Sequence, residues 1–200
     1  AGRSELLEAL FGVRTIASGE MIYDGKKLHF SSSRDAMEHS FALVTEERKF
    51  NGMFGKASIE FNTTITNLDS YKTNGVLSER KLYEAARREI TTMRTKCVSP
   101  DEIITSLSGG NQQKVIIGKW IERQPEVFLM DEPTRGIDVG AKYEIYQLII
   151  QMAKEGKTII VVSSEMPEIL GITNRIAVMS NHRLAGIVET AETDQEALLR

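Results

Sequence analysis

The sequence predicts an α/β fold built on a parallel β-sheet, and three observations support this prediction. Two short runs, Val127–Met130 and Thr158–Val162, are apolar on successive residues, which is typical of parallel strands covered on both faces. A helical pattern over Ala141–Lys154 separates them. A strand, a helix and a second strand in this order indicate a parallel sheet with right-handed crossovers. Small antiparallel β pieces near the N-terminus and an inserted α-helical segment complete the predicted fold.

The first 47 residues predict a helix followed by short strands. Apolar residues on one face indicate an N-terminal helix that ends at Gly12: Leu6, Leu7, Leu10 and Phe11. Two strands, a short helix and a third strand are then expected, in this order: Met21–Tyr23, Lys27–Phe30, Arg34–Glu38 and Phe41–Val44. The turn pair Asp24-Gly25 favours a hairpin between the first two strands.

A long helical pattern marks the middle of the chain. Ser78–Lys96 begins with a suitable N-cap residue, Ser78, and carries its apolar residues on one face: Leu82, Ala86, Ile90 and Met93. Few β-branched runs occur around it. We therefore interpret residues 48–104 as an α-helical subdomain inserted into an α/β core that comprises residues 1–47 and 105–200.

Further elements are expected in the C-terminal half. A helix over Asn111–Arg123 should bury one face: Val115, Ile116 and Trp120. Two more strands, Arg175–Met179 and Leu184–Val188, are separated by a turn at Asn181. A terminal helix over Asp194–Leu199 follows.

Composition limits the class of protein. The 200 residues suit one domain with a subdomain, and 41% apolar and 26% charged residues are ordinary for a globular protein. The net charge of −3 argues against a nucleic-acid partner. A single cysteine, Cys97, excludes an internal disulfide, and the three histidines form no metal-ligand pattern. With no apolar run of membrane-spanning length and no signal peptide in view, we expect a soluble, cytosolic chain.

A glycine-rich stretch, Leu107–Gln113, is the first candidate for chemistry. Ser108, Gly109 and Gly110 form a turn that opens a helix, and such a turn offers unpaired backbone N–H groups to an anion. The alternative is an ordinary loop in which Ser108 caps the helix and the glycines supply a tight turn.

Two carboxylates at the end of a predicted strand are the second candidate. Asp131 and Glu132 follow Met130 directly, and ligands of open parallel sheets bind beyond the carboxyl ends of the strands. Asp131 is placed to hold Mg²⁺ through water, and Glu132 to orient an attacking water molecule. The alternative is that these acids cap the next helix. The following Pro133-Thr134 and the upstream glycine motif favour the functional interpretation.

The order of these motifs resembles that in the ATP-binding domains of ABC transporters, which have a P-loop NTPase core. Residues 107–113 resemble the family's signature motif, residues 128–134 its Walker B motif and residues 136–138 its D-loop. The resemblance extends over essentially the whole chain. More narrowly, residues 131–142 and 163–168 are similar to the second domain of tandem monosaccharide-importer ATPases. Residues 170–175 and 178–181 are most similar to galactose/methyl galactoside importers, with ribose importers next.

The resemblance implies ATP and Mg²⁺ as cofactors and assigns roles to particular residues. The implied catalytic residue is Glu132. The implied metal ligands are Ser4, Asp131 and Glu46. The implied nucleotide-binding residues are Gly2, Arg3, Ser4, Ser108, Gly109, Gly110, Gln112, Asp138 and Ser164.

Three of these positions depart from the family pattern. Ala1-Gly2-Arg3-Ser4 resembles the end of the Walker A motif, so we expect the chain to begin inside the phosphate loop, without the first core strand and most of that loop. Arg3 replaces the usual lysine, Glu46 the Q-loop glutamine and Ser164 the switch histidine. We therefore hypothesise a half-degenerate pair of domains, in which the glycine motif completes the ATP site of the other domain while the domain's own site is weak.

The resemblance also implies partners and a location. These are the N-terminal ATP-binding domain of the same polypeptide, membrane-spanning permease subunits and, indirectly, a periplasmic sugar-binding protein, at the cytoplasmic face of the inner membrane. The apolar stretch Phe50–Gly55 is either a docking site for the permease or a loop packed on the helical subdomain.

We also consider two alternatives to an importer ATPase. One is a regulatory partner domain that binds nucleotide without hydrolysing it. The other, disfavoured, is an ABC ATPase of DNA maintenance, because the 60 residues between Glu46 and Leu107 lack the sustained heptads of a coiled coil. No sugar-contacting residue is expected on this chain.

Overall fold

The computed structural model describes residues 2–199, so Ala1 of the Walker A-like segment lies outside the described residues. Three parallel strands form the central sheet in the order β3 (Phe41–Val44), β6 (Val127–Asp131) and β7 (Thr158–Val162). Helix α6 (Val139–Lys154) makes the crossover from β6 to β7. The predicted parallel α/β fold is therefore confirmed.

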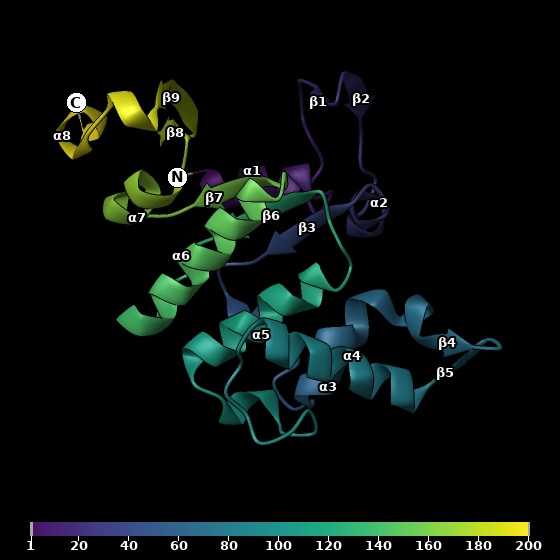
Figure 1. Cartoon of the computed structure of the whole chain (residues 1–200). Helices are drawn as coiled ribbons and strands as arrows, with labels where there is room; N and C mark the ends of the chain where they lie inside the picture. The colour runs from purple at the N-terminus through teal and green to yellow at the C-terminus, as the bar shows by residue number, and fades with distance from the viewer. Residues whose placement is uncertain (1, 200) are drawn as a thin grey trace.

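Helices cover the sheet from two sides. In Figure 1, α1 (Arg3–Leu10) lies above the sheet, whereas α5 (Gly109–Ile121) and α6 lie below and in front of it. The core between these layers includes all of β6, with Trp120 of α5 packed edge-on against Phe11 at a ring-centroid distance of 5.8 Å. Because β6 is buried on both faces, the packing around it fixes the position of its carboxyl end.

Two predictions of burial were wrong. Thr158–Val162 is not covered on both faces: it pairs only with β6, and the side chain of Ile160 on β7 is 40% exposed. Leu6 was expected on the buried face of the first helix but is 47% exposed, while Leu7 is fully buried. The buried face of α1 is narrower than the apolar pattern indicated: Leu7 and the C-cap residue Phe11 are buried, and Leu10 is partly buried against the core.

The segment between β3 and β6 is largely helical and forms the lower right part of the molecule in Figure 1. It contains one turn of π-helix, η1 (Arg48–Gly52), helices α3 (Ile59–Thr64) and α4 (Glu79–Thr92), and the 3₁₀ turns η2 (Ile65–Tyr71) and η3 (Ile104–Ser106). Helix α3 packs on α4 and α5. The side chain of Ser78 accepts a hydrogen bond from the N–H of Lys81, as expected of an N-cap.

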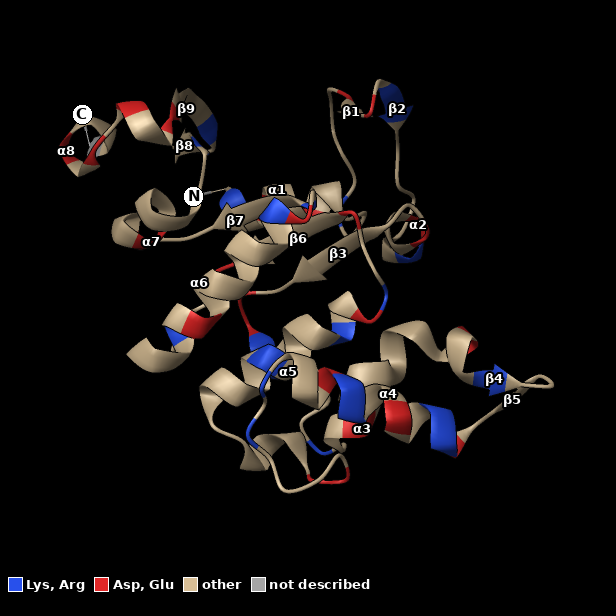
Figure 2. Ribbon diagram, viewed as in Figure 1, with Lys and Arg blue, Asp and Glu red and all other residues tan. Residues whose placement is uncertain are grey.

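Two features of this segment differ from the sequence prediction. The helix from Ser78 stops at Thr92 rather than Lys96, because Arg94 takes a left-handed backbone conformation with φ of 49°. A small hairpin, β4 (Lys72–Thr73) with β5 (Val76–Leu77), was not predicted. Acidic and basic residues are interspersed along the ribbon of α4 (Figure 2).

The remaining elements are short. Strands β1 (Met21–Tyr23) and β2 (Lys26–Leu28) form the predicted hairpin, and both turn residues, Asp24 and Gly25, have positive φ. Helix α2 (Ser33–Glu38) follows them, close to its predicted position.

The last 35 described residues contain α7 (Met166–Ile172), β8 (Arg175–Ser180), β9 (Arg183–Glu189), the 3₁₀ turn η4 (Thr190–Glu192) and α8 (Gln195–Leu199). The predicted strands β8 and β9 exist, but they form their own antiparallel sheet because a two-residue turn at Asn181-His182 joins them directly. Across residues 2–199, no helix is long and apolar enough to cross a membrane.

A buried acid joins α4 to α5. Glu89 of α4 lies against Gly118, where an added Cβ would be 3.0 Å from Glu89 Oε2, and it is close to Glu122 at the end of α5. Glu122 is itself bound by the Tyr71 hydroxyl at 2.9 Å and by Arg88 at 2.7 Å. Burial, together with the charge of Glu122, raises the pKa of Glu89 to about 7.

The raised pKa of Glu89 predicts a pH-dependent stability. The folded chain holds this proton up to about pH 7, whereas the unfolded chain releases it near the ordinary value, so the free energy of unfolding should fall as pH rises from about 4.5 to 7. With solvent screening, the fall should be about 2 kcal/mol. Glu89→Gln should remove this fall, as measured by urea unfolding from pH 4.5 to 8. Glu84→Gln, at an exposed position on the same helix, serves as the control, and parallel curves for the Glu89→Gln and original chains would contradict the prediction.

Candidate functional site

The carboxyl ends of β6 and β7 meet at one edge of the sheet, where Asp131 is in register with Val162. The chain then bends sharply: the N–H of Glu132 donates to the carbonyl of Val162 at 2.8 Å, and Glu132 has a φ of 47°. A left-handed conformation costs a non-glycine residue free energy and is found at functional turns. Residues 131–138, which we call the acidic turn, begin at this bend.

Asp131 is buried beside the start of α1. The Ser4 hydroxyl is hydrogen-bonded to its carboxylate, while Oδ1 of Asp131 is buried without a hydrogen-bond partner among the described residues. Burial raises the pKa of Asp131 above its ordinary value, and the charge of Glu8 adds to the rise. A buried carboxylate oxygen without a partner calls for a cation or a water molecule.

A cavity of about 100 Å³ opens in front of Asp131. Four of its eight lining residues carry carboxylates: Glu8, Glu46, Glu47 and Asp131. The other four are Ser4, Leu43, Thr45 and Asn51. We call it the acidic cavity. Glu46 lies on its wall as expected, but an ion pair with Arg135 holds its carboxylate.

The acidic cavity fits a hydrated divalent cation. A hydroxyl and an unpartnered carboxylate oxygen, from Ser4 and Asp131, are hard oxygen donors of the kind that Mg²⁺ prefers. In residues 2–199 no group of three or more His, Cys, Asp or Glu side chains is arranged to hold a metal ion. A cation here would therefore take its other ligands from water or from phosphate oxygens, as Mg²⁺ usually does.

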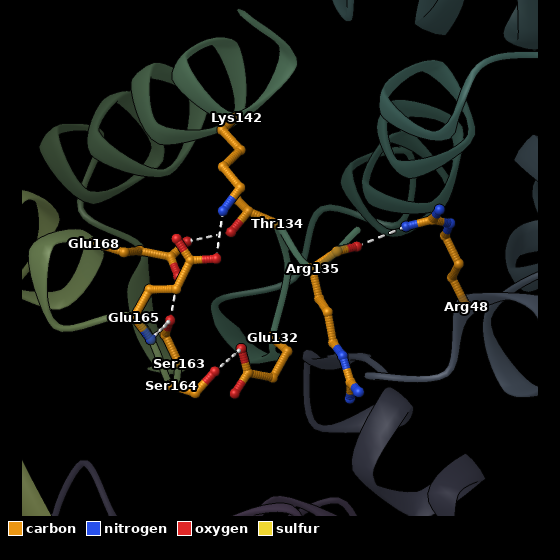
Figure 3. Close-up of polar contacts among 9 residues, drawn as sticks. All are labelled: Arg48, Glu132, Thr134, Arg135, Lys142, Ser163, Ser164, Glu165 and Glu168. Atoms are coloured by element: carbon orange, nitrogen blue, oxygen red, sulfur yellow. Dashed lines mark hydrogen bonds and ion pairs between the residues drawn. The ribbon is translucent and has the colours of Figure 1, made fainter. Parts of the chain in front are cut away.

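Three predicted site residues lie together beyond the strand ends. The Ser164 hydroxyl donates to Glu132 Oε2 at 3.3 Å (Figure 3), and Arg3 Nη2 is 3.8 Å from Glu132 Oε1. Arg3 Nη1 also donates to the carbonyl of Ser163 at 2.9 Å. The guanidinium of Arg3 is thus engaged by the end of β7 and by the candidate base.

A buried carboxylate that sequence reasoning missed, Glu168 of α7, ties these segments together. Thr134 Oγ1 donates to Glu168 Oε1 at 2.6 Å, and the Ser163 hydroxyl donates to Oε2 (Figure 3). Lys142 of α6 forms an ion pair with the neighbouring Glu165. The acidic turn, the end of β7 and α7 are therefore joined through one side chain. Residue spacing gave no signal for Glu168, since its burial depends on tertiary packing.

Neither carboxylate of the strand end caps the next helix. The residue that caps α6 is the exposed Asp138. Its Oδ1 accepts a hydrogen bond from the N–H of Ala141 at 3.0 Å. The capping alternative for Asp131 and Glu132 is therefore wrong.

The glycine loop, residues 107–113, opens α5 with Ser108 at the N-cap position. Within the described part of the chain the Ser108 side chain caps no backbone N–H; it accepts a hydrogen bond from Asn111 Nδ2 at 2.9 Å. Gln112, predicted to bind nucleotide, is instead buried, and its Nε2 donates to the carbonyl of Leu107 at 2.9 Å. In this structure Gln112 holds the loop rather than facing outward.

The two glycines permit close packing between the glycine loop and the acidic turn. A Cβ built on Gly110 would lie 2.3 Å from the Cβ of Ala141, and one built on Gly109 would lie 3.3 Å from the carbonyl oxygen of Gly136. Residues of the glycine loop are not among those that line the acidic cavity. The predicted site residues therefore form two groups. One lies at the strand ends, in the cavity wall or next to it in sequence or space: Arg3, Ser4, Glu46, Asp131, Glu132 and Ser164. The other lies where the glycine loop meets the acidic turn and the start of α6.

This fold, with an acid at the buried end of the central strand and a glycine turn opening the helix beside it, defines an ATP-binding cassette. A solved nucleotide-free cassette from an ABC transporter matches 98% of the chain and 82% of its own length, with a TM-score of 0.82 at 16% identity. A dimeric cassette in a post-hydrolysis state bound to ADP and Pi matches 94% of the chain and 81% of its own length, with a TM-score of 0.78 at 20% identity.

The profile of the ABC transporter family matches residues 1–135, and the chain belongs to this family. The galactose/methyl galactoside import ATP-binding protein MglA of Treponema denticola is 78% identical over all 200 residues, and that of Treponema pallidum is 76% identical. The corresponding protein of Clostridium perfringens is 56% identical over 200 residues. The chain spans about two fifths of the length of these relatives, 39–40% in each case.

The contacts of Glu168 predict a measurable coupling between α7 and the acidic turn. Removing one partner leaves the other buried and unsatisfied, so Thr134→Val should cost about 1–2 kcal/mol of unfolding free energy and Glu168→Leu about 2–4 kcal/mol. The double variant should lose about 1–2 kcal/mol less than the sum.

Urea unfolding of the four chains measures this cycle. Thr91→Val, at an exposed threonine that bonds only to its own helix, is the matched control and should change stability by less than about 0.5 kcal/mol. Strict additivity of Thr134→Val and Glu168→Leu would show that the hydrogen bond between them contributes nothing.

Proposed function

We propose that this chain is the C-terminal ATP-binding domain of an ABC importer for a monosaccharide, with galactose or methyl galactoside as the transported sugar. The similarity to import ATP-binding proteins extends over every residue of the chain and includes both candidate groups of site residues. The observation that carries the mechanism is the division of the site, in which the glycine loop lies apart from the acidic cavity.

Ser4 and Asp131 would hold Mg²⁺ at the acidic cavity, with Glu46 as an outer ligand. When bound, the ion neutralises the phosphate oxygens of ATP and helps to polarise the bond that breaks. Gly2 is the N-cap residue of α1, and no side chain caps this helix among the described residues, so its first N–H groups would be available to a phosphate.

The domain's own site is the weaker of two in this proposal. Glu132 is placed to orient a water molecule, but Arg3 lies beside its carboxylate instead of pointing freely toward a phosphate. The Ser164 hydroxyl donates to Glu132. A serine side chain is shorter than the histidine usual at this position, so it would reach less far toward a phosphate. The four carboxylates around the cavity also repel an anionic phosphate until a cation is bound.

The glycine loop would serve the ATP held by the N-terminal ATP-binding domain of the same polypeptide. Ser108 is exposed, and the N–H groups of Gly109 and Gly110 open α5, so a phosphate of a facing domain could accept from them. Asp138 would border the same interface. Gln112 would act indirectly, through its hydrogen bond to the loop.

The α-helical segment at 48–104 would act as a subdomain that meets the membrane partner, while residues 1–47 and 105–200 form the α/β core. Within Phe50–Gly55, Met53 is buried in the core, whereas Phe50 is 84% exposed and Phe54 packs on Phe61 at the surface. The exposed rings would contact membrane-spanning permease subunits at the cytoplasmic face of the inner membrane. Sugar recognition would belong to the permease and a periplasmic binding protein.

A second candidate is a regulatory domain that binds nucleotide without hydrolysing it, and the engagement of Arg3 with Glu132 favours it. Nucleotide binding without turnover at the domain's own site, after the partner site has been inactivated in the tandem protein, would support this candidate. An ABC ATPase of DNA maintenance is disfavoured, because the longest helix between β3 and the glycine loop, α4, has only 14 residues.

Two substitutions in the tandem protein test the asymmetry. Ser108→Arg places a bulky cation on the glycine loop and should abolish transport-linked ATP hydrolysis, a loss of about 100-fold or more if the loop completes the productive site. Glu132→Gln should cost much less, about threefold, because it affects the weaker site.

ATP hydrolysis by vesicles containing the permease, with sugar-loaded binding protein present, is the measurement. Ser70→Arg, at an exposed serine on the helical segment, is the control for introducing an arginine. Comparable losses for Ser108→Arg and Glu132→Gln would overturn the asymmetry.

A further inference from the structure

Arg48 connects two parts of the chain that are far apart in sequence. It begins η1, and its guanidinium donates from Nη1 to the carbonyl of Arg135 at 2.8 Å and from Nη2 to the carbonyl of Gly136 at 3.3 Å. In Figure 3 its side chain extends from the η1 segment toward the acidic turn. Charged donors to backbone carbonyls are stronger than neutral ones, so this fork fixes the backbone of the turn.

The same guanidinium packs against the glycine loop. A Cβ built on Gly109 would lie 2.9 Å from Arg48 Nη2. Glycine at this position therefore leaves the space that Arg48 fills between the loop and the turn. The ion pair between Arg135 and Glu46 adds a second connection in the reverse direction, from the turn back to the segment before η1.

The other end of η1 is attached to α5, the helix that the glycine loop opens. Lys119 Nζ donates to the carbonyl of Gly52 at 2.7 Å, and a Cβ built on Gly52 would lie 3.3 Å from the side chain of Ile116. Between these two attachments Phe50 projects into solvent. A force applied at Phe50 therefore acts on a single helical turn that is held at one end by Arg48 and at the other by α5.

We propose that Arg48 is a positioning residue that links partner contact at Phe50 to the placement of the glycine loop and the acidic turn. The proposal rests on the function proposed above, in which the permease contacts Phe50 and the glycine loop serves ATP of the facing domain. In this proposal Arg48 acts through the backbone of the acidic turn and the glycine loop rather than by contact with ATP. It sets the spacing between Gly109 and Gly136, and a shift of η1 changes that spacing.

Arg48→Gln in the tandem protein tests this link, because glutamine keeps a polar side chain but loses the forked cation. Assembled with its permease in vesicles, the original protein should hydrolyse ATP faster when sugar-loaded binding protein is added. In Arg48→Gln the ratio of stimulated to basal hydrolysis should fall by about fivefold. Arg48→Lys keeps the charge without the fork and should recover part of the ratio. Arg80→Gln, which removes an exposed arginine paired only with Glu84, should leave the ratio unchanged.

A second measurement does not depend on transport. Hydrogen exchange of the tandem protein should show faster exchange at residues 108–112 and 136–140 in Arg48→Gln, and no change there in Arg80→Gln. Faster exchange at both segments together with the lower ratio supports the proposal. Unchanged exchange, or equal losses of basal and stimulated hydrolysis with the ratio preserved, overturns it. If the original protein shows no stimulation, the proposed function fails, and exchange alone then decides whether Arg48 positions the two segments.

Discussion

The pairing of β6 between β3 and β7 is the constraint on which the rest of the site depends. Since β6 is buried on both faces, its register with β7 determines where the strand ends and where the chain must bend. The hydrogen bond from the Glu132 N–H to Val162 closes that bend and places Glu132 beside Ser164. A slip of one residue would turn Asp131 away from Ser4. The chemistry at the sheet edge is thus positioned by apolar packing beneath it.

The charges around this edge are arranged in pairs rather than left open. Arg135 is engaged by Glu46, Arg3 lies beside Glu132, and Lys142 pairs with Glu165. The acidic cavity still carries an excess of carboxylates. Among residues 2–199, Asp131 Oδ1 has no hydrogen-bond partner there. Such a cavity attracts a cation first and a phosphate only through it, since bare carboxylates and phosphates repel each other.

Sequence reasoning identified the local features and missed those that depend on distant contacts. The hairpin turn at Asp24-Gly25 and the cap at Ser78 are specified by adjacent residues, and both were predicted. Glu168 was missed because its partner Thr134 is 34 positions away, and Arg48 because its partner Arg135 is 87 positions away. The continuous apolar run at Thr158–Val162 also led to an overestimate of burial, as at Ile160, because such a run reports which residues are apolar and not which elements cover them. The roles of individual site residues stay predictions.

The glycines at 109 and 110 have a structural reason that is independent of any ligand, because side chains there would collide with Arg48 and Ala141. The close packing that the two glycines allow is also compatible with the anion-binding role proposed for the loop. The glycine loop packs closely on the acidic turn, its residue Ser108 is exposed, and none of its residues lines the chain's own acidic cavity. In the proposed function, a phosphate that reaches the first N–H groups of α5 belongs to a second domain, so the steric requirement within one domain would favour a site shared between two.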